Sequence, residues 1–138
     1  KRDYICQVGD KVVELNDEGF KSVRPDTLIK ISNDYFLVVD SKVSLDNFKA
    51  YVNEKKDEHL KKEHLKKHLK SINDHIDSLA KKNYANSLRR KVFPSVVMFI
   101  AFEAGYLAAL EHDPDINEKA YRKNIIPYYQ YMSPNHCL

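Results

Sequence analysis

Hydrophobic and polar positions along the first third of the chain predict a series of strands. Four short apolar stretches have the composition and partial alternation that are typical of strands, and they cover residues 3–8, 11–15, 23–31 and 35–42. The segment NDEG at 16–19 predicts a turn, and residues 32–34 predict a compact hairpin connection. The apolar run from Tyr35 to Val39 indicates a central strand covered on both sides.

The middle of the chain has a helical pattern. Ser44 is a typical N-cap for a helix over 45–52. A long helix is predicted from Glu58 to Lys82, because its apolar residues recur at steps of four and three positions and form one stripe: Leu65, Leu69, Ile72, Ile76 and Leu79. Lysines crowd the other faces of this helix.

The last third of the chain continues the alternation of strands and helices. A link at 83–91 precedes a predicted buried strand at 95–102. Helices are expected at 105–111 and 116–124, the first ending before an Asp-Pro pair. The order of elements predicts one α/β domain over residues 1–138, in which helices flank a central mixed sheet.

Composition narrows the classes of protein that the chain can belong to. Its 138 residues suit one domain with a sizeable core, and only three glycines exclude a glycine-rich dinucleotide or phosphate loop. Cys6 and Cys137 form no disulfide framework or zinc motif, which favours a reducing, cytoplasmic compartment. No stretch is apolar enough to span a membrane. Because the chain begins with Lys1 rather than Met, we expect a fragment.

Positive charge is concentrated in one part of the chain. Residues 53–91 contain 12 Lys and Arg against 6 Asp and Glu, whereas the remaining residues contain 11 against 14. A basic stretch of this kind favours a polyanionic partner such as DNA. A lysine-rich helix face exposed to solvent would give the same pattern, so both interpretations stay open at this point.

Two charged residues close the most apolar predicted strand. Alternation along a strand places Asp40 and Lys42 on the same face as Phe36 and Val38. Charges beside a buried strand are costly unless they are paired. One solution is a mutual ion pair. The other is a divalent cation, Mg²⁺ or Mn²⁺, shared with Asp26 of the neighbouring strand, with the lysine stabilising charge that develops on a phosphate.

These residues resemble a known nuclease signature. Pro25-Asp26 followed by Asp40-Ser41-Lys42 is similar to the PD-(D/E)XK pattern of restriction-endonuclease-like nucleases. A wider similarity links the chain to the RmuC family of bacterial DNA recombination proteins. The stretches that carry it are DYICQ (3–7), RPDTLIKI (24–31), VVDSKVSLDNFKAY (38–51), HLKSINDHIDSLAKKNY (68–84) and VVMFIAFEAGYLAAL (96–110).

The resemblance implies a fold, a reaction and a set of roles. It implies a restriction-endonuclease-like core and a Mg²⁺- or Mn²⁺-dependent deoxyribonuclease that hydrolyses phosphodiester bonds. Asp26 and Asp40 would be metal ligands, the backbone carbonyl of Ser41 a further ligand, and Lys42 the catalytic lysine. Two alternatives stay open: a nuclease-like fold that only binds DNA or a protein partner, and a structural domain in which Asp40 and Lys42 form an ion pair.

The chain departs from the family pattern at both ends. The first helix of the family would precede Tyr4 and is absent from the sequence. Its loss is expected to leave one sheet face bare, which favours a homo-oligomer. The tail at 127–138 is atypical, and the hypothesis for it is a change of reading frame or a truncation near Pro127.

Basic and aromatic residues around the 83–91 link are the predicted DNA contacts. Positive charges would bind the phosphate backbone and the tyrosine would stack on a base or sugar. This group consists of Lys81, Lys82, Tyr84, Arg89, Arg90 and Lys91. A solvated loop is the alternative.

Three further positions are candidates for supporting roles. Glu103 is predicted either as a carboxylate near the metal site or as the acid that begins a helix. His75 and His68 lie next to the apolar stripe, where they would contact phosphate or be partly buried core histidines. His64 and His68 have the spacing of a zinc pair, but no third ligand is close in sequence, so we expect exposed histidines.

Overall fold

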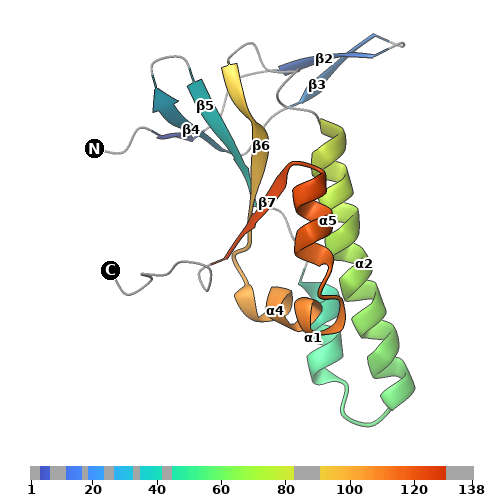
Figure 1. Ribbon diagram of the computed structural model, residues 1–138. Coiled ribbons are helices and arrows are strands. Elements are labelled where there is room, and N and C mark those ends of the chain that lie inside the picture. Colours follow the sequence, from blue (N-terminus) through green and yellow to red (C-terminus); the bar gives the residue numbers. More distant parts are fainter. Residues whose placement is uncertain are drawn as a thin grey trace, which may run out of the picture.

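The structure is a computed structural model of the chain, and it confirms a mixed α/β architecture (Figure 1). It describes residues 4–6, 12–16, 19–23, 27–32, 35–41, 45–82 and 91–129. Asp26, Lys42, Tyr84, Arg89 and Arg90 lie outside these ranges.

Five of the described strands form one mixed sheet in the order β1-β4-β5-β6-β7. The strands β1, β4 and β5 pair antiparallel, whereas β5, β6 and β7 run parallel. Their bounds are β1 (Tyr4–Cys6), β4 (Thr27–Ser32), β5 (Tyr35–Asp40), β6 (Lys91–Phe99) and β7 (Ile125–Tyr128). A separate antiparallel hairpin joins β2 (Val12–Asn16) to β3 (Gly19–Val23).

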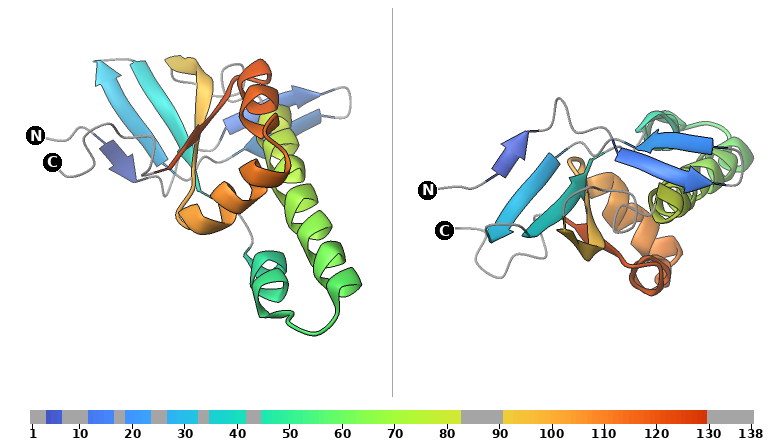
Figure 2. Two further views of the ribbon diagram at one scale, coloured as in Figure 1. Left: turned by 60° about the horizontal axis from the view of Figure 1, so that its bottom comes forward. Right: turned by 90° about the horizontal axis from the view of Figure 1, so that it is seen from above.

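The helices connect the parallel strands. Parallel neighbours cannot be joined by a tight turn, so the chain crosses over through helical segments. These are α1 (Asp46–Asn53) and α2 (Glu58–Lys82) between β5 and β6, then α4 (Glu103–His112) and α5 (Ile116–Arg122) between β6 and β7. The views in Figure 2 place these helices on the same side of the sheet.

The core lies between this sheet face and the helices. Alternate residues of β5 are buried, among them Phe36 and Val38, and they form one cluster with the apolar stripe of α2. Ile72, Ile76 and Leu79 of α2 are each only 1% exposed. The predicted stripe is therefore confirmed in its second half. At its first half His68 takes the buried position, and Leu69 packs only partly against the cluster.

The opposite face of the sheet carries exposed apolar side chains. Ile31 at the end of β4 is 54% exposed, and others on this face are Ile29, Phe93, Phe99 and Tyr128. Phe99 and Tyr128 stack on one another, with ring centroids 6.1 Å apart. No helix of the described part of the chain covers this face (Figure 2). Self-association through it stays a prediction.

Several predicted element bounds were wrong. β5 ends at Asp40 rather than at 42, and α1 begins at Asp46, with Leu45 instead of Ser44 at its capping position. The expected strand at 95–102 begins earlier, at Lys91. Pro94 does not break it, because the ladder with β5 shifts register between the pairs Phe36↔Val92 and Val38↔Val96.

Two strands were missed altogether. The pattern NDEG predicts a turn through Gly19, whereas Gly19 is the first residue of β3, the second strand of a hairpin. β7 overlaps the start of the atypical tail at residues 127 and 128. Asn124 adopts a left-handed backbone conformation with φ of 59° and turns the chain from α5 into β7. Pro127 is tolerated because β7 is an edge strand.

Shortening a side chain of the buried stripe tests this packing. We expect Ile76→Ala to lower the free energy of unfolding by about 2–5 kcal/mol, because it leaves a cavity in the core. The control is Leu60→Ala on the same helix, where the side chain is 41% exposed and the change should stay within about 0.5 kcal/mol. Urea denaturation measures both, and similar losses would contradict the described packing.

Candidate functional site

The carboxylate of Asp40 is buried at the end of a central strand. Asp40 follows Phe36 and Val38 on the helix-facing side of β5, and it is only 2% exposed. Among described residues of the core, Asp40 and His68 are the buried polar side chains. A carboxylate at such a place needs positive charge or hydrogen-bond donors around it.

Lys82 supplies positive charge from another element. It is the last residue of α2, and its Nζ lies 3.4 Å from Oδ2 of Asp40. The Asp40 side chain is 3% exposed and the Lys82 side chain 35%. The helix thus brings one predicted DNA-contacting lysine against one predicted metal ligand, although the two residues are 42 positions apart. No local pattern of residues predicts this pairing.

The other predicted site residues are only partly brought together. Ser41 is exposed and directly follows β5, so it adjoins Asp40 in the chain. Lys81 is exposed beside Lys82 at the end of α2. Lys91 lies elsewhere: it pairs with Tyr35 at the opposite end of β5, about 16 Å along the strand from Asp40.

The two supporting candidates occupy helices. Glu103 is the first residue of α4. This matches the predicted role of an acid at the start of a helix, where its negative charge interacts favourably with the positive end of the helix dipole. His75 is partly buried on α2. Whether either residue supports a metal site stays a prediction.

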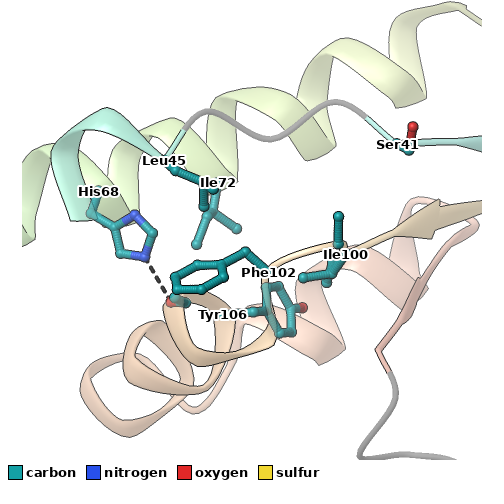
Figure 3. Close-up of a pocket in the computed structure, with 9 residues that line it drawn as sticks. Ser41, Leu45, His68, Ile72, Ile100, Phe102 and Tyr106 are labelled. Atoms are coloured by element: carbon teal, nitrogen blue, oxygen red, sulfur yellow. Dashed lines mark hydrogen bonds between the residues drawn. The ribbon is translucent and has the colours of Figure 1, made fainter. Parts of the chain in front are cut away.

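A small pocket lies beyond the carboxyl ends of β5 and β6 (Figure 3). Ser41 follows β5 and Ile100 follows β6, and both line the pocket, because parallel neighbours end at the same edge of a sheet. Its volume of about 40 Å³ holds a few water molecules and is too small for a nucleotide. The remaining lining comes from the helices and their starts: Leu45, His68, Ile72, Ala101, Phe102, Gly105 and Tyr106.

His68 joins α2 to α4 at this pocket. Its Nε2 lies 2.7 Å from the carbonyl oxygen of Gly105, and its ring packs on Phe48 with centroids 5.2 Å apart (Figure 3). A carbonyl only accepts, so Nε2 donates the proton. Its Nδ1 has no hydrogen-bond partner among the described residues. A Cβ at Gly105 would lie 3.4 Å from both Phe48 and Phe102, which is ordinary van der Waals contact.

The burial of His68 corrects the expectation from the sequence. It was expected to be exposed, to contact phosphate or to be partly buried, but it is 1% exposed. A signal was present in the sequence: His68 precedes Ile72 and Ile76 at successive steps of four, which continues the buried stripe toward the start of α2.

The donor set around Asp40 suits a hard cation in its chemistry. Carboxylate and carbonyl oxygens are the ligands that Mg²⁺ and Mn²⁺ prefer. The described part of the chain contributes one carboxylate, and no group of three or more His, Cys, Asp or Glu that could hold a metal occurs among the described residues. The predicted second carboxylate, Asp26, lies outside the described ranges.

Comparison with known sequences decides the family. The sequence profile described as "RmuC family" matches residues 1–130. The chain belongs to the RmuC family. The match extends past Pro127, and so does β7, so neither supports the expected change of reading frame at that point.

Named relatives of the RmuC family agree with this assignment. The chain is 40% identical over 115 residues to a "DNA recombination protein RmuC homolog" of Zymomonas mobilis, covering 83% of the chain and 25% of the relative. Identity to the homolog of Pasteurella multocida is 36% over 113 residues, covering 81% and 22%. Identity to that of Pseudomonas aeruginosa is 33% over 125 residues, covering 91% and 26%.

The chain spans about a quarter of the length of these RmuC relatives. No solved structure matches it significantly. Among the described residues, no helix combines the length and apolar character that crossing a membrane requires.

The contact of His68 with Gly105 is testable through stability. Replacement by alanine leaves a buried carbonyl without its donor and opens space beside Phe48, so we expect His68→Ala to cost about 2–4 kcal/mol of unfolding free energy. The control is His59→Ala, because His59 is exposed on the same helix. Chemical denaturation of both variants provides the measurement, and an unchanged midpoint for His68→Ala would exclude the role described.

Proposed function

We propose that this RmuC-family chain is a metal-dependent deoxyribonuclease domain that acts in DNA recombination. The observation that carries the proposal is the carboxylate of Asp40, which is buried at the end of β5 with an ammonium group 3.4 Å away. A buried anion beside a basic helix is costly for a purely structural domain. It is expected where a cation must be bound.

The proposed metal ligands are Asp40, Asp26 and the backbone carbonyl of Ser41. Support for the pair of carboxylates comes from the antiparallel ladder of β4 and β5, whose last described pair is Thr27↔Val39. Continued by one residue on each strand, this register would set position 26 opposite position 40. That is the alignment that a shared cation needs.

The proposed chemistry is hydrolysis of a phosphodiester bond. A bound Mg²⁺ or Mn²⁺ would polarise the phosphate and lower the pKa of a water molecule. The two carboxylates would orient the ion, and the ammonium of Lys42 would stabilise the negative charge that develops on the phosphate oxygens. The pocket beside Ser41 has room for water but not for a base, so the substrate would approach over the surface.

The order of elements is consistent with a restriction-endonuclease-like core, which we include in the proposal. An antiparallel pair, β4 and β5, is followed by helices and by a parallel strand, β6. The motif residues Asp26 and Asp40-Ser41-Lys42 flank the described ends of this antiparallel pair. Relatives carry the description "DNA recombination protein", which supports DNA as the substrate.

The proposed DNA-binding surface begins at the end of α2. Lys81 is exposed there, next to Lys82. The predicted contacts Tyr84, Arg89 and Arg90 follow in the chain. Lys91 would extend this surface along the sheet to the far end of β5. A DNA duplex could span the distance between Lys81 and Lys91.

Cleavage assays test the reaction. With Mg²⁺ or Mn²⁺ present, we expect single-stranded or branched DNA to be cut, and both Asp40→Asn and Lys42→Ala to lower the rate by at least about 100-fold. Chelation of the metal should abolish cutting. The matched control is Asp74→Asn, since Asp74 is an exposed acid of α2 paired with Lys70.

Circular dichroism confirms whether each variant is folded before its rate is compared. Cutting that persists in Asp40→Asn would exclude Asp40 as a ligand. DNA binding without any cutting, unchanged in the Asp40 and Lys42 variants, would favour the alternative function of a binding module. Absence of both binding and cutting would favour a structural domain.

Salt dependence tests the DNA surface separately. If Lys81 contacts a phosphate, Lys81→Gln should reduce the slope of log affinity against log salt concentration by about one. The control is Lys49→Gln, which makes the same charge change on α1, near the other end of α2 (Figure 1). Fluorescence anisotropy at several salt concentrations measures both slopes, and equal slopes would reject Lys81 as a contact.

A further inference from the structure

The ion pair of Lys82 with Asp40 differs from the other ion pairs of α2. Lys70 and Asp74 pair on the helix surface, with side chains 74% and 59% exposed. In contrast, the Asp40 side chain is only 3% exposed. Surface pairs contribute little to stability, whereas the charge around a buried carboxylate strongly affects its free energy.

The contact between Lys82 and Asp40 is long for an ion pair, and the lysine side chain is partly exposed. The separation of 3.4 Å exceeds the 2.7–2.9 Å that is typical of a strong charge-assisted hydrogen bond. Lys82 is the last residue of α2 and its side chain is 35% exposed. Its four-carbon stem is flexible, whereas Asp40 cannot leave the core.

A divalent cation at Asp40 would have to share this space. Such an ion binds carboxylate oxygens at about 2.0–2.1 Å, so it would lie within a few ångströms of an ammonium that contacts the same carboxylate. Two positive charges at that separation repel one another strongly in a partly buried site. The ammonium and the ion therefore cannot both occupy their preferred positions beside the carboxylate.

We infer that Lys82 is a placeholder cation for the metal at Asp40. The ammonium stabilises the carboxylate in the metal-free protein, and a divalent cation displaces it on binding. This inference rests on the proposed metal-dependent function and adds a residue to it. It assigns Lys82 a role in setting metal affinity, distinct from the catalytic role proposed for Lys42.

The first test measures metal affinity without any reaction. Calorimetric titration of the 138-residue chain with Mn²⁺ is expected to give a Kd at least about tenfold lower for Lys82→Met than for the wild type, because a competing charge has been removed. The control Lys67→Met makes the same change at an exposed residue of the same helix and should leave the Kd unchanged. Asp40→Asn should lose binding.

A second variant has the opposite expectation. Lys82→Arg keeps the charge and can contact a carboxylate with two N–H groups, so its Kd for Mn²⁺ should equal or exceed that of the wild type. Because this variant preserves the ion pair, it remains informative if Lys82→Met does not fold.

Thermal melting provides an independent readout. Lys82→Met should melt below the wild type without metal, and saturating Mn²⁺ should raise its melting temperature more than that of the wild type. Equal Kd values for wild type, Lys82→Met and Lys82→Arg, with binding lost in Asp40→Asn, would overturn the inference and leave the proposed metal site intact. Absence of Mn²⁺ binding to every protein would overturn both.

Discussion

The contact of α2 with the helix-facing side of the sheet is the interaction on which the rest of this structure depends. Ile72, Ile76 and Leu79 form one buried cluster with side chains of the strands. The alternation of β5 that buries Phe36 and Val38 in this cluster also buries the carboxylate of Asp40, since all three share one face. Burial of a charge is thus a consequence of how the strand packs.

The buried apolar stripe of α2 ends at Leu79, and the charged residues Lys81 and Lys82 follow it at the end of the helix. Leu79 is 1% exposed, and Lys82, three residues further along the helix, contacts Asp40. The order of residues on α2 therefore places the ammonium group of Lys82 at the edge of the core, next to the buried carboxylate of Asp40. In the same helix, ion pairs such as that of Lys70 with Asp74 lie in water, where screening leaves them little influence on the fold.

The parallel pairing of β5 and β6 also determines where the pocket forms. β5 and β6 end at the same edge of the sheet, so the residues that follow them, Ser41 and Ile100, line one pocket. His68 ties α2 to the first turn of α4 there by donating to the carbonyl of Gly105. This hydrogen bond holds the two crossover connections together next to the strand end that carries Asp40.

By itself, the sequence determined the α/β class, the hairpin of β4 and β5, the approximate extent of α2 and the family. Hydrophobic periodicity and local motifs are properties of neighbouring residues, so a single sequence carries them. It did not determine β3, β7 or the early start of β6, whose strands depend on ladder partners far away in the chain. Only the tertiary structure decided that Lys82 meets Asp40, that His68 is buried against Gly105, and that Lys91 lies at the opposite end of β5. Such pairings arise from packing between distant elements, and no local pattern of residues encodes them.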